Sequence, residues 1–199
     1  LAQLIKEMSY MLEVAQRALD KAMDNFINRT EDEEPVRKDL REINFLSGKV
    51  TDYLIRLSEE DMSHNDELTV SSLYKVLSDI MRVADFSNNI MRYLRVAVAN
   101  ELYFSSEGLN EIKEMYSLVD ELFKDVDYTF ANRTTRLLAK IEDTESKTDK
   151  FKLQLQQNHL DRLKGGNCKS ESSSLYVNLI GNIERVADHL VYIAQSVKE

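Results

Sequence analysis

Apolar residues recur every three or four positions along most of the chain, a spacing that keeps them on one face of an α-helix. In the first half, such runs cover residues 4–27, 36–57 and about 68–100, and a polar segment at 63–66 separates the last two. Pro35 suits the first turn of the second helix, where a missing backbone N–H costs nothing. The first half therefore predicts three consecutive amphipathic helices.

The second half repeats this plan. Apolar runs cover residues 109–126, 141–163 and 175–197, and the middle one is the weakest. Gly165 and Gly166 predict a helix end between the last two runs, because glycine readily adopts the left-handed conformation that closes a helix. These stripes of Leu, Met and Tyr are typical of a helical core.

Three short strings recur in the same order, at shifts of 104, 102 and 103 residues. They are Asn-Arg-Thr at 28–30 and 132–134, Ser-Ser-Leu-Tyr at 71–74 and 173–176, and Arg-Val-Ala-Asp at 82–85 and 185–188. Three ordered matches at nearly constant spacing indicate an internal repeat, in which the Ser-Ser-Leu-Tyr pair lies slightly out of phase. We predict an all-α fold of two tandem three-helix bundles related by duplication, residues 1–101 and 102–199, within a single domain 1–199.

Composition narrows the classes of function. Only 5 glycines and 1 proline occur in 199 residues, and 31% of residues are charged, which suits long helices. The net charge of −9 argues against binding to nucleic acid, whose phosphates require clustered Lys and Arg. No apolar run reaches the length of a membrane-spanning helix. Cys168 is the only cysteine, which excludes an intrachain disulfide and a cysteine-rich zinc site.

The end of the chain carries a more specific signal. The stretch HLDRLKGGNCKSESSSLYVNLIGNIERVADHLVYIA, residues 159–194, pairs a His-x-x-Arg-Leu helix end with a loop containing glycine and cysteine and a final Ile-Glu-Arg-Val-Ala-Asp-His helix. It resembles PhoU-like domains, most of all the C-terminal cytoplasmic domain of bacterial sodium/phosphate cotransporters. The duplicated three-helix plan agrees with the fold that this resemblance implies.

The resemblance also implies a metal cluster held by pairs of Glu/Asp-x-x-x-Asp motifs on neighbouring helices. The matching residues here are Glu145 and Asp149 in one helix, and Glu184 and Asp188 in the last. Residues four apart lie on one helix face, so both carboxylates of a pair can reach the same ion. The implied cofactor is a divalent or iron cluster of Fe, Mn, Zn or Mg, and hard oxygen ligands suit such ions.

The first half departs from this pattern at three of the four equivalent positions. Met81 stands in place of the glutamate of the last helix, and Leu40 and Asn44 stand in place of the preceding pair. Asp85 is retained, and Asn89 keeps an asparagine that the family places four residues after the aspartate. We predict a degenerate first site and a single competent one in the second half.

Two residues beside the predicted ligands are candidates for supporting them. His189 directly follows one aspartate and faces another side of the helix, which favours a structural role over ligation. Arg185 directly follows a glutamate and is expected to form a salt bridge between helices rather than to bind phosphate. A third residue, His159, is expected to hydrogen-bond across the bundle.

The resemblance implies a regulatory function without catalysis. We expect the regulatory domain of a sodium-dependent phosphate transporter that controls phosphate uptake through protein contacts. It would be cytoplasmic and tethered to the inner face of the membrane by an N-terminal transporter domain. The alternatives are a free-standing PhoU-like regulator of the phosphate regulon, which would contact a transporter in a complex or a histidine kinase, and a metal-free helical adaptor. A homodimer is compatible with each. A ferritin-like metalloenzyme is disfavoured, because no histidine follows a glutamate by three positions.

Overall fold

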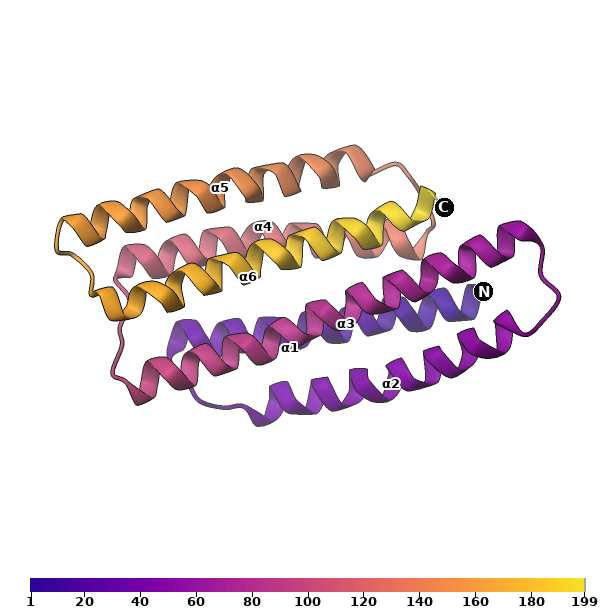
Figure 1. The fold of residues 1–199 in the computed structure, drawn as a ribbon, viewed down its shortest axis with the longest axis horizontal. Helices are drawn as coiled ribbons and strands as arrows, with labels where there is room; N and C mark the ends of the chain where they lie inside the picture. Colours follow the sequence, from indigo (N-terminus) through magenta and orange to yellow (C-terminus); the bar gives the residue numbers. More distant parts are fainter. Residues whose placement is uncertain (199) are drawn as a thin grey trace.

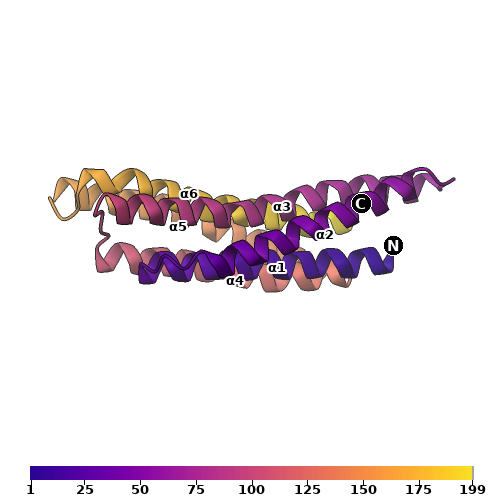
Figure 2. The ribbon, with the colours of Figure 1, turned by 90° about the horizontal axis from the view of Figure 1, so that it is seen from below.

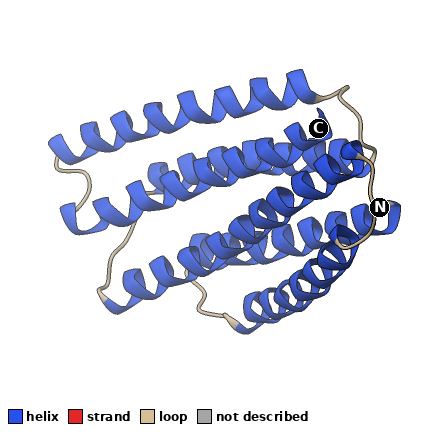
Figure 3. Ribbon diagram, turned by 45° about the vertical axis from the view of Figure 1, so that its right-hand side comes forward, coloured by secondary structure: helices blue, strands red, loops and turns tan. Residues whose placement is uncertain are grey.

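The protein is built from long helices (Figure 1). The computed structural model describes residues 1–198, and its regular elements in that range are all helical (Figure 3). They are α1 (Ala2–Asn28), α2 (Glu34–Ser58), α3 (His64–Ala99), α4 (Ser106–Ala131), α5 (Leu138–Lys164), α6 (Ser170–Gln195) and a 3-10 turn η1 (Ser196–Lys198). Within residues 1–198, no helix has the length and hydrophobicity needed to cross a bilayer.

The helices form two bundles, α1–α3 and α4–α6, that lie side by side (Figure 1). The bundles contact each other through α1 with α4 and through α3 with α6. Seen along the layers, α1 and α4 lie in one layer and α3 and α6 in the other (Figure 2). This arrangement confirms the predicted all-α fold of two tandem three-helix bundles.

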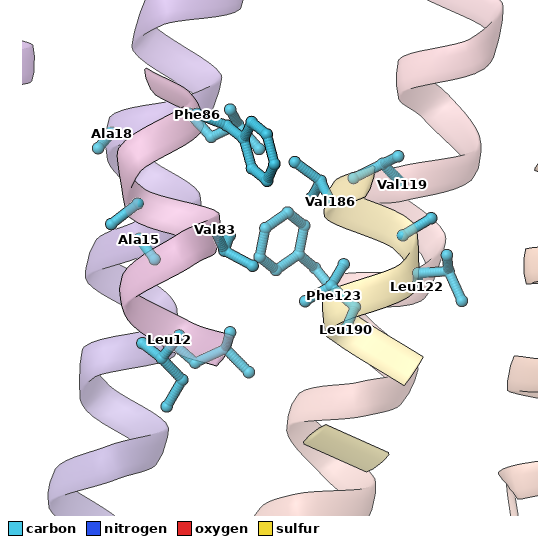
Figure 4. Close-up of a cluster of buried hydrophobic side chains, with 14 of the residues drawn as sticks. Leu12, Ala15, Ala18, Val83, Phe86, Val119, Leu122, Phe123, Val186 and Leu190 are labelled. Atoms are coloured by element: carbon cyan, nitrogen blue, oxygen red, sulfur yellow. The ribbon is translucent and has the colours of Figure 1, made fainter. Parts of the chain in front are cut away.

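The core runs through the region where the two bundles meet. Val83 and Phe86 from α3 face Phe123 from α4 and Val186 from α6 across this region (Figure 4). Phe123 and Val186 are each 1% exposed, and the core is continuous from one bundle to the other. Burial of apolar surface is the main stabilising term in folding, so the two repeats stabilise each other.

The repeated Asn-Arg-Thr string has a structural role at the ends of α1 and α4. Arg29, the C-cap of α1, and Arg133, which directly follows the C-cap of α4, both adopt the left-handed conformation, with φ of 54° and 48°. The Arg29 guanidinium donates to the carbonyl oxygens of Ala97 and Leu102, and that of Arg133 donates to the carbonyl of Ser196. Each arginine thereby ties the end of the first helix of its bundle to the end of the third.

Burial confirms that the repeated Ser-Ser-Leu-Tyr strings are out of phase. Leu73 is 0% exposed and Tyr176 is 1% exposed, whereas Tyr74 is 36% exposed. The helices α3 and α6 therefore correspond at a shift of 103 residues, which pairs Leu73 with Tyr176. This is also the shift of the Arg-Val-Ala-Asp strings.

The start of α3 differs from the prediction. The helix begins at His64 rather than near residue 68, because the Ser63 hydroxyl accepts from the Asp66 backbone N–H at 3.3 Å and caps it. Gly166 has a φ of 70° just beyond the end of α5, as predicted. The division between residues 101 and 102 falls in the connection between α3 and α4, and this exact boundary stays a prediction.

Candidate metal centre

Two pairs of carboxylates meet between α5 and α6. Glu145 and Asp149 lie one turn apart on α5, and Glu184 and Asp188 lie one turn apart on α6, which packs against α5. One carboxylate oxygen from each of Glu145, Asp149 and Asp188 lies within 4.8 Å of the other two. The fold thus brings together the residues that the sequence predicted as ligands. We call these four residues the carboxylate cluster.

Glu184 lies beside a lysine of α5. Lys152 donates from Nζ to Glu184 Oε2 at 3.3 Å, and Glu184 also hydrogen-bonds with Asp149. The side chains of Glu184 and Lys152 are 15% and 28% exposed. Lys152 is the one cation paired with the cluster within residues 1–198, so most of its negative charge is left without a counterion in the protein.

Burial and mutual repulsion oppose ionisation of the cluster. The pKa of Glu145 is raised to about 7, first by burial and then by the neighbouring carboxylates of Asp149 and Asp188. Burial also raises the pKa of Glu184, with further contributions from Asp149 and Asp188, whereas Lys152 acts in the opposite direction. A cation among these oxygens would remove the repulsion that raises both pKa values.

The donor chemistry fits a hard metal ion. All four candidate ligands are carboxylates, which suit Mg²⁺, Mn²⁺ and iron. Within residues 1–198, no imidazole or thiolate joins the group of possible ligand atoms, so the donor set favours these ions over zinc. The carboxylates are half-buried, which gives an ion access while excluding part of the solvent.

The equivalent positions of the first bundle form no such cluster. Asn44 and Asp85 are exposed, and Leu40 and Met81 pack in or against the hydrophobic core. Asn89 donates from Nδ2 to Oδ1 of Asn182 on α6 at 3.0 Å, and thus serves the contact between the bundles. Leu40 and Met81 thus belong to the packed structure of the first bundle, whereas Asn44 and Asp85 face the solvent.

His189 and Arg185, which were expected to support the ligands, do not contact the carboxylate cluster in the expected way. His189 Nδ1 lies 2.8 Å from Asp79 Oδ1 on α3, so this histidine joins α6 to the other bundle. Arg185 is exposed, and no carboxylate within residues 1–198 forms an ion pair with it. The interhelical ion pair at this place is instead made by Lys152 on α5 with Glu184 on α6.

A second polar network lies at the other end of the α4–α6 bundle, and the sequence predicted only the role of His159 in it. Arg162 forms a salt bridge with Glu111 on α4, and Tyr176 donates its hydroxyl to Glu111 Oε2 at 2.7 Å. His159 is 4% exposed, stacks on Tyr176 and lies 2.7 Å from the Ser173 hydroxyl. The cross-bundle role expected of His159 is therefore confirmed, whereas nothing in the local sequence singles out Glu111.

Comparison with known proteins agrees with this architecture. The sequence model of the PhoU domain matches residues 8–94 and, a second time, residues 112–197. The crystal structure of PhoU from Pseudomonas aeruginosa superimposes with a TM-score of 0.87 at 16% identity, covering 98% of this chain and 93% of that one. The likeness to that structure shows the fold. The two matches of the family model confirm the internal repeat.

Two curated relatives are similar in sequence. The phosphate-specific transport system accessory protein PhoU homolog 1 of Thermotoga maritima is 24% identical over 64% of this chain and 54% of its own length. The putative inorganic phosphate export protein YjbB of Escherichia coli O157:H7 is 24% identical over 84% of this chain. The chain spans 31% of the length of YjbB.

These findings place the chain in a class of duplicated helical proteins with three helices in each repeat. Because the PhoU domain model covers most of both bundles, the chain belongs to the PhoU family.

Proposed function

We propose that this protein is a non-catalytic regulator of phosphate transport, of the PhoU type, which acts through contacts with a transport protein. Membership of the PhoU family carries the proposal. The names of both curated relatives, one an accessory protein of phosphate-specific transport and the other a putative phosphate exporter, support it. No set of side chains for nucleophilic or acid–base catalysis was found in the sequence, and the proposal requires none.

Phosphate uptake in cells tests this function. Deletion of the gene is expected to leave uptake of radiolabelled phosphate high when external phosphate is abundant, because the restraint on transport is lost. The wild-type gene on a plasmid should restore the decline in uptake. Uptake that responds normally to phosphate in the deletion strain would contradict the proposal.

The second part of the proposal is that the carboxylate cluster binds a metal ion. The convergence of Glu145, Asp149 and Asp188 within 4.8 Å, in a half-buried setting with one paired lysine, supports it. Iron, Mn²⁺ or Mg²⁺ would neutralise the carboxylates and link α5 to α6, which would stiffen that face of the bundle.

Elemental analysis of untagged protein tests metal binding. We expect metal in the wild-type protein, and its loss in Glu184→Ala/Asp188→Ala. Asp85→Ala removes the carboxylate at the equivalent position of the first bundle and should leave the metal content unchanged. Protein that stays metal-free and shows the same Tm with added iron, Mn²⁺ or Mg²⁺ would contradict a metal site and favour a helical adaptor.

A second arrangement places the regulator in the same polypeptide as a membrane transporter, in the cytoplasm and tethered to the inner face of the membrane. The match to less than a third of the putative exporter YjbB favours it. An antibody against this chain would separate the two arrangements in cell extracts. A band confined to the soluble fraction supports the free-standing regulator, and a band of much higher mass confined to membranes supports the tethered domain.

A further inference from the structure

A cationic groove lies next to the carboxylate cluster, where α3, α5 and α6 come together. Its volume is about 340 Å³, and its lining includes Arg92 from α3, Lys152 from α5 and Arg185 from α6. No carboxylate is part of the lining. Three cationic side chains from three helices thus line one groove of a protein whose net charge is −9. We call this site the arginine groove.

The two arginines of the groove form no ion pair within residues 1–198. Both Arg92 and Arg185 are exposed, and neither forms an ion pair with a carboxylate within the described part of the chain. The Arg92 guanidinium lies 5.5 Å from the ring centre of Tyr93, a contact that orients it. Lys152 is different, because Glu184 already balances its charge. The groove therefore offers two planar guanidinium groups, which can each donate two parallel hydrogen bonds to an oxyanion.

Tyr93 adds a neutral hydrogen-bond donor to the lining of the groove. Tyr93 is 8% exposed, and its hydroxyl oxygen accepts from Asn182 Nδ2 at 2.9 Å. Asn182 is itself fixed, because Nδ2 also donates to the Asn178 carbonyl at 2.7 Å and Oδ1 accepts from Asn89 at 3.0 Å. The Tyr93 hydroxyl donates to no acceptor within residues 1–198, so its hydrogen remains available to a ligand.

The repeat supplies a contrasting groove at the other end of the α3–α6 contact. It has a volume of about 360 Å³ and is lined by Lys75, Asp79 and Gln195 among others. At the shift of 103 residues, Asp79 corresponds to Asn182, and Gln195 corresponds to Arg92. The lining of the second groove thus contains a carboxylate and has a glutamine in place of Arg92, and Arg82, which corresponds to Arg185, is not part of it. The fold thus creates two similar hollows, of which the arginine groove alone has arginines and no carboxylate in its lining.

We propose that the arginine groove binds a phosphate-type oxyanion, which Arg92 and Arg185 hold between them and to which Tyr93 donates a hydrogen bond. The shared chemistry is a tetrahedral, multiply charged oxyanion, either inorganic phosphate or a phosphate group of a small metabolite. The volume of the groove admits both. The proposal goes beyond the regulatory function and does not depend on metal binding, because none of these three residues belongs to the carboxylate cluster.

Calorimetric titration of the full chain tests the proposal. The protein is first treated with EDTA and then titrated at low ionic strength with inorganic phosphate, pyrophosphate or ATP, with chloride as the reference salt. We expect saturable binding of at least one ligand. Arg92→Gln and Arg185→Gln should each weaken it about tenfold, since each removes a charged, bidentate contact. Tyr93→Phe should weaken it about threefold. Circular dichroism should show unchanged helix content, because both arginines are exposed.

Arg82→Gln is the matched control. Arg82 is exposed on α3 at the position that corresponds to Arg185, so this variant changes the net charge equally without touching the groove. Its affinity should equal that of the wild type. Binding of pyrophosphate or ATP without binding of phosphate would support the proposal and identify the ligand as a phosphorylated metabolite. An equal loss in Arg82→Gln, or no saturable binding of any of the three ligands, would overturn it.

Discussion

The two bundles share one helical plan but differ in what fills the face between their second and third helices. In the second bundle this face holds four carboxylates and Lys152. In the first bundle Leu40 is 8% exposed in the core, and Met81 packs against it. The first face is thus stabilised by apolar contacts, and the second keeps polar groups that repel one another.

The difference shows that conservation of a fold does not require conservation of a site. A helix pair can bury either apolar side chains or partnered polar groups, since an unpartnered buried charge is strongly unfavourable. The second bundle buries polar groups between its helices, and the pKa of Glu145 is therefore raised to about 7. Such a destabilising arrangement is typical of a functional site.

The largest effect is expected from placing a carboxylate back into the first bundle. Met81→Glu copies Glu184 at a partly buried position that packs against the core. The free energy of unfolding should fall by about 2–4 kcal/mol at pH 8 with EDTA, because a charge is buried without a partner. Urea denaturation measures it. Asp85→Glu, at an exposed position of the same helix, should change stability by less than about 0.5 kcal/mol. Equal midpoints for the two variants would show that the faces differ in something other than burial.

The reverse exchange should stabilise the second bundle. Glu145→Leu copies Leu40 and removes the carboxylate whose ionisation is most strongly opposed by burial and by its neighbours. The free energy of unfolding should rise by about 1–2 kcal/mol at pH 8 with EDTA. Asp143→Leu, at an exposed position of the same helix, should give no such gain. A loss of stability in Glu145→Leu would mean that the glutamate makes favourable contacts that outweigh the repulsion.

The helices were predictable because each one buries a single face, and the spacing of apolar residues records that face directly. The Asn-Arg-Thr string at the end of α1 indicated the duplication. The sequence did not show that Arg29 caps the helix. The start of α3 was missed because Ser63 caps the helix from within a segment that has the composition of a loop.

The candidate sites were predictable in part. The resemblance selected Glu145, Asp149, Glu184 and Asp188 from 35 acidic residues, and spacing alone could not have done so. Metal binding itself stays a prediction. Lys152 has no local signal, because it lies in a charged stretch of α5 and its role depends on α6. The arginine groove depends on contact between Tyr93 and Asn182, which are 89 positions apart, and such pairings follow from the packing of the bundles.

The smallest effect is expected where the bundles meet, between α1 and α4. Asp120 on α4 hydrogen-bonds with Asp20 on α1. The Tyr116 hydroxyl also donates to Asp20, and Asp24 lies close to these three side chains. The pKa of Asp120 is raised to about 6, first by burial and then by Asp20. The folded protein therefore binds the proton of Asp120 more tightly than the unfolded protein does, because the pKa of Asp120 in the unfolded chain is near 3.8. The stabilisation is complete below pH 3.8, declines as the pH rises, and is lost above about 6.

Asp120→Asn tests this difference, because Gln16, at the corresponding position of the first repeat, is a neutral amide. The amide cannot ionise, so the variant should not show the contribution of Asp120 to the fall in Tm between pH 4 and 7. We expect that contribution to be on the order of 2 °C, since the Asp120 side chain is exposed and solvent screens the repulsion. Thermal unfolding of both proteins at several pH values measures it, with Asp143→Asn as an exposed control. If Tm falls with pH in the Asp120→Asn variant as much as in the wild type, Asp120 does not cause the pH dependence. Glu145 in the carboxylate cluster, whose pKa is also raised, would then be the next group to examine.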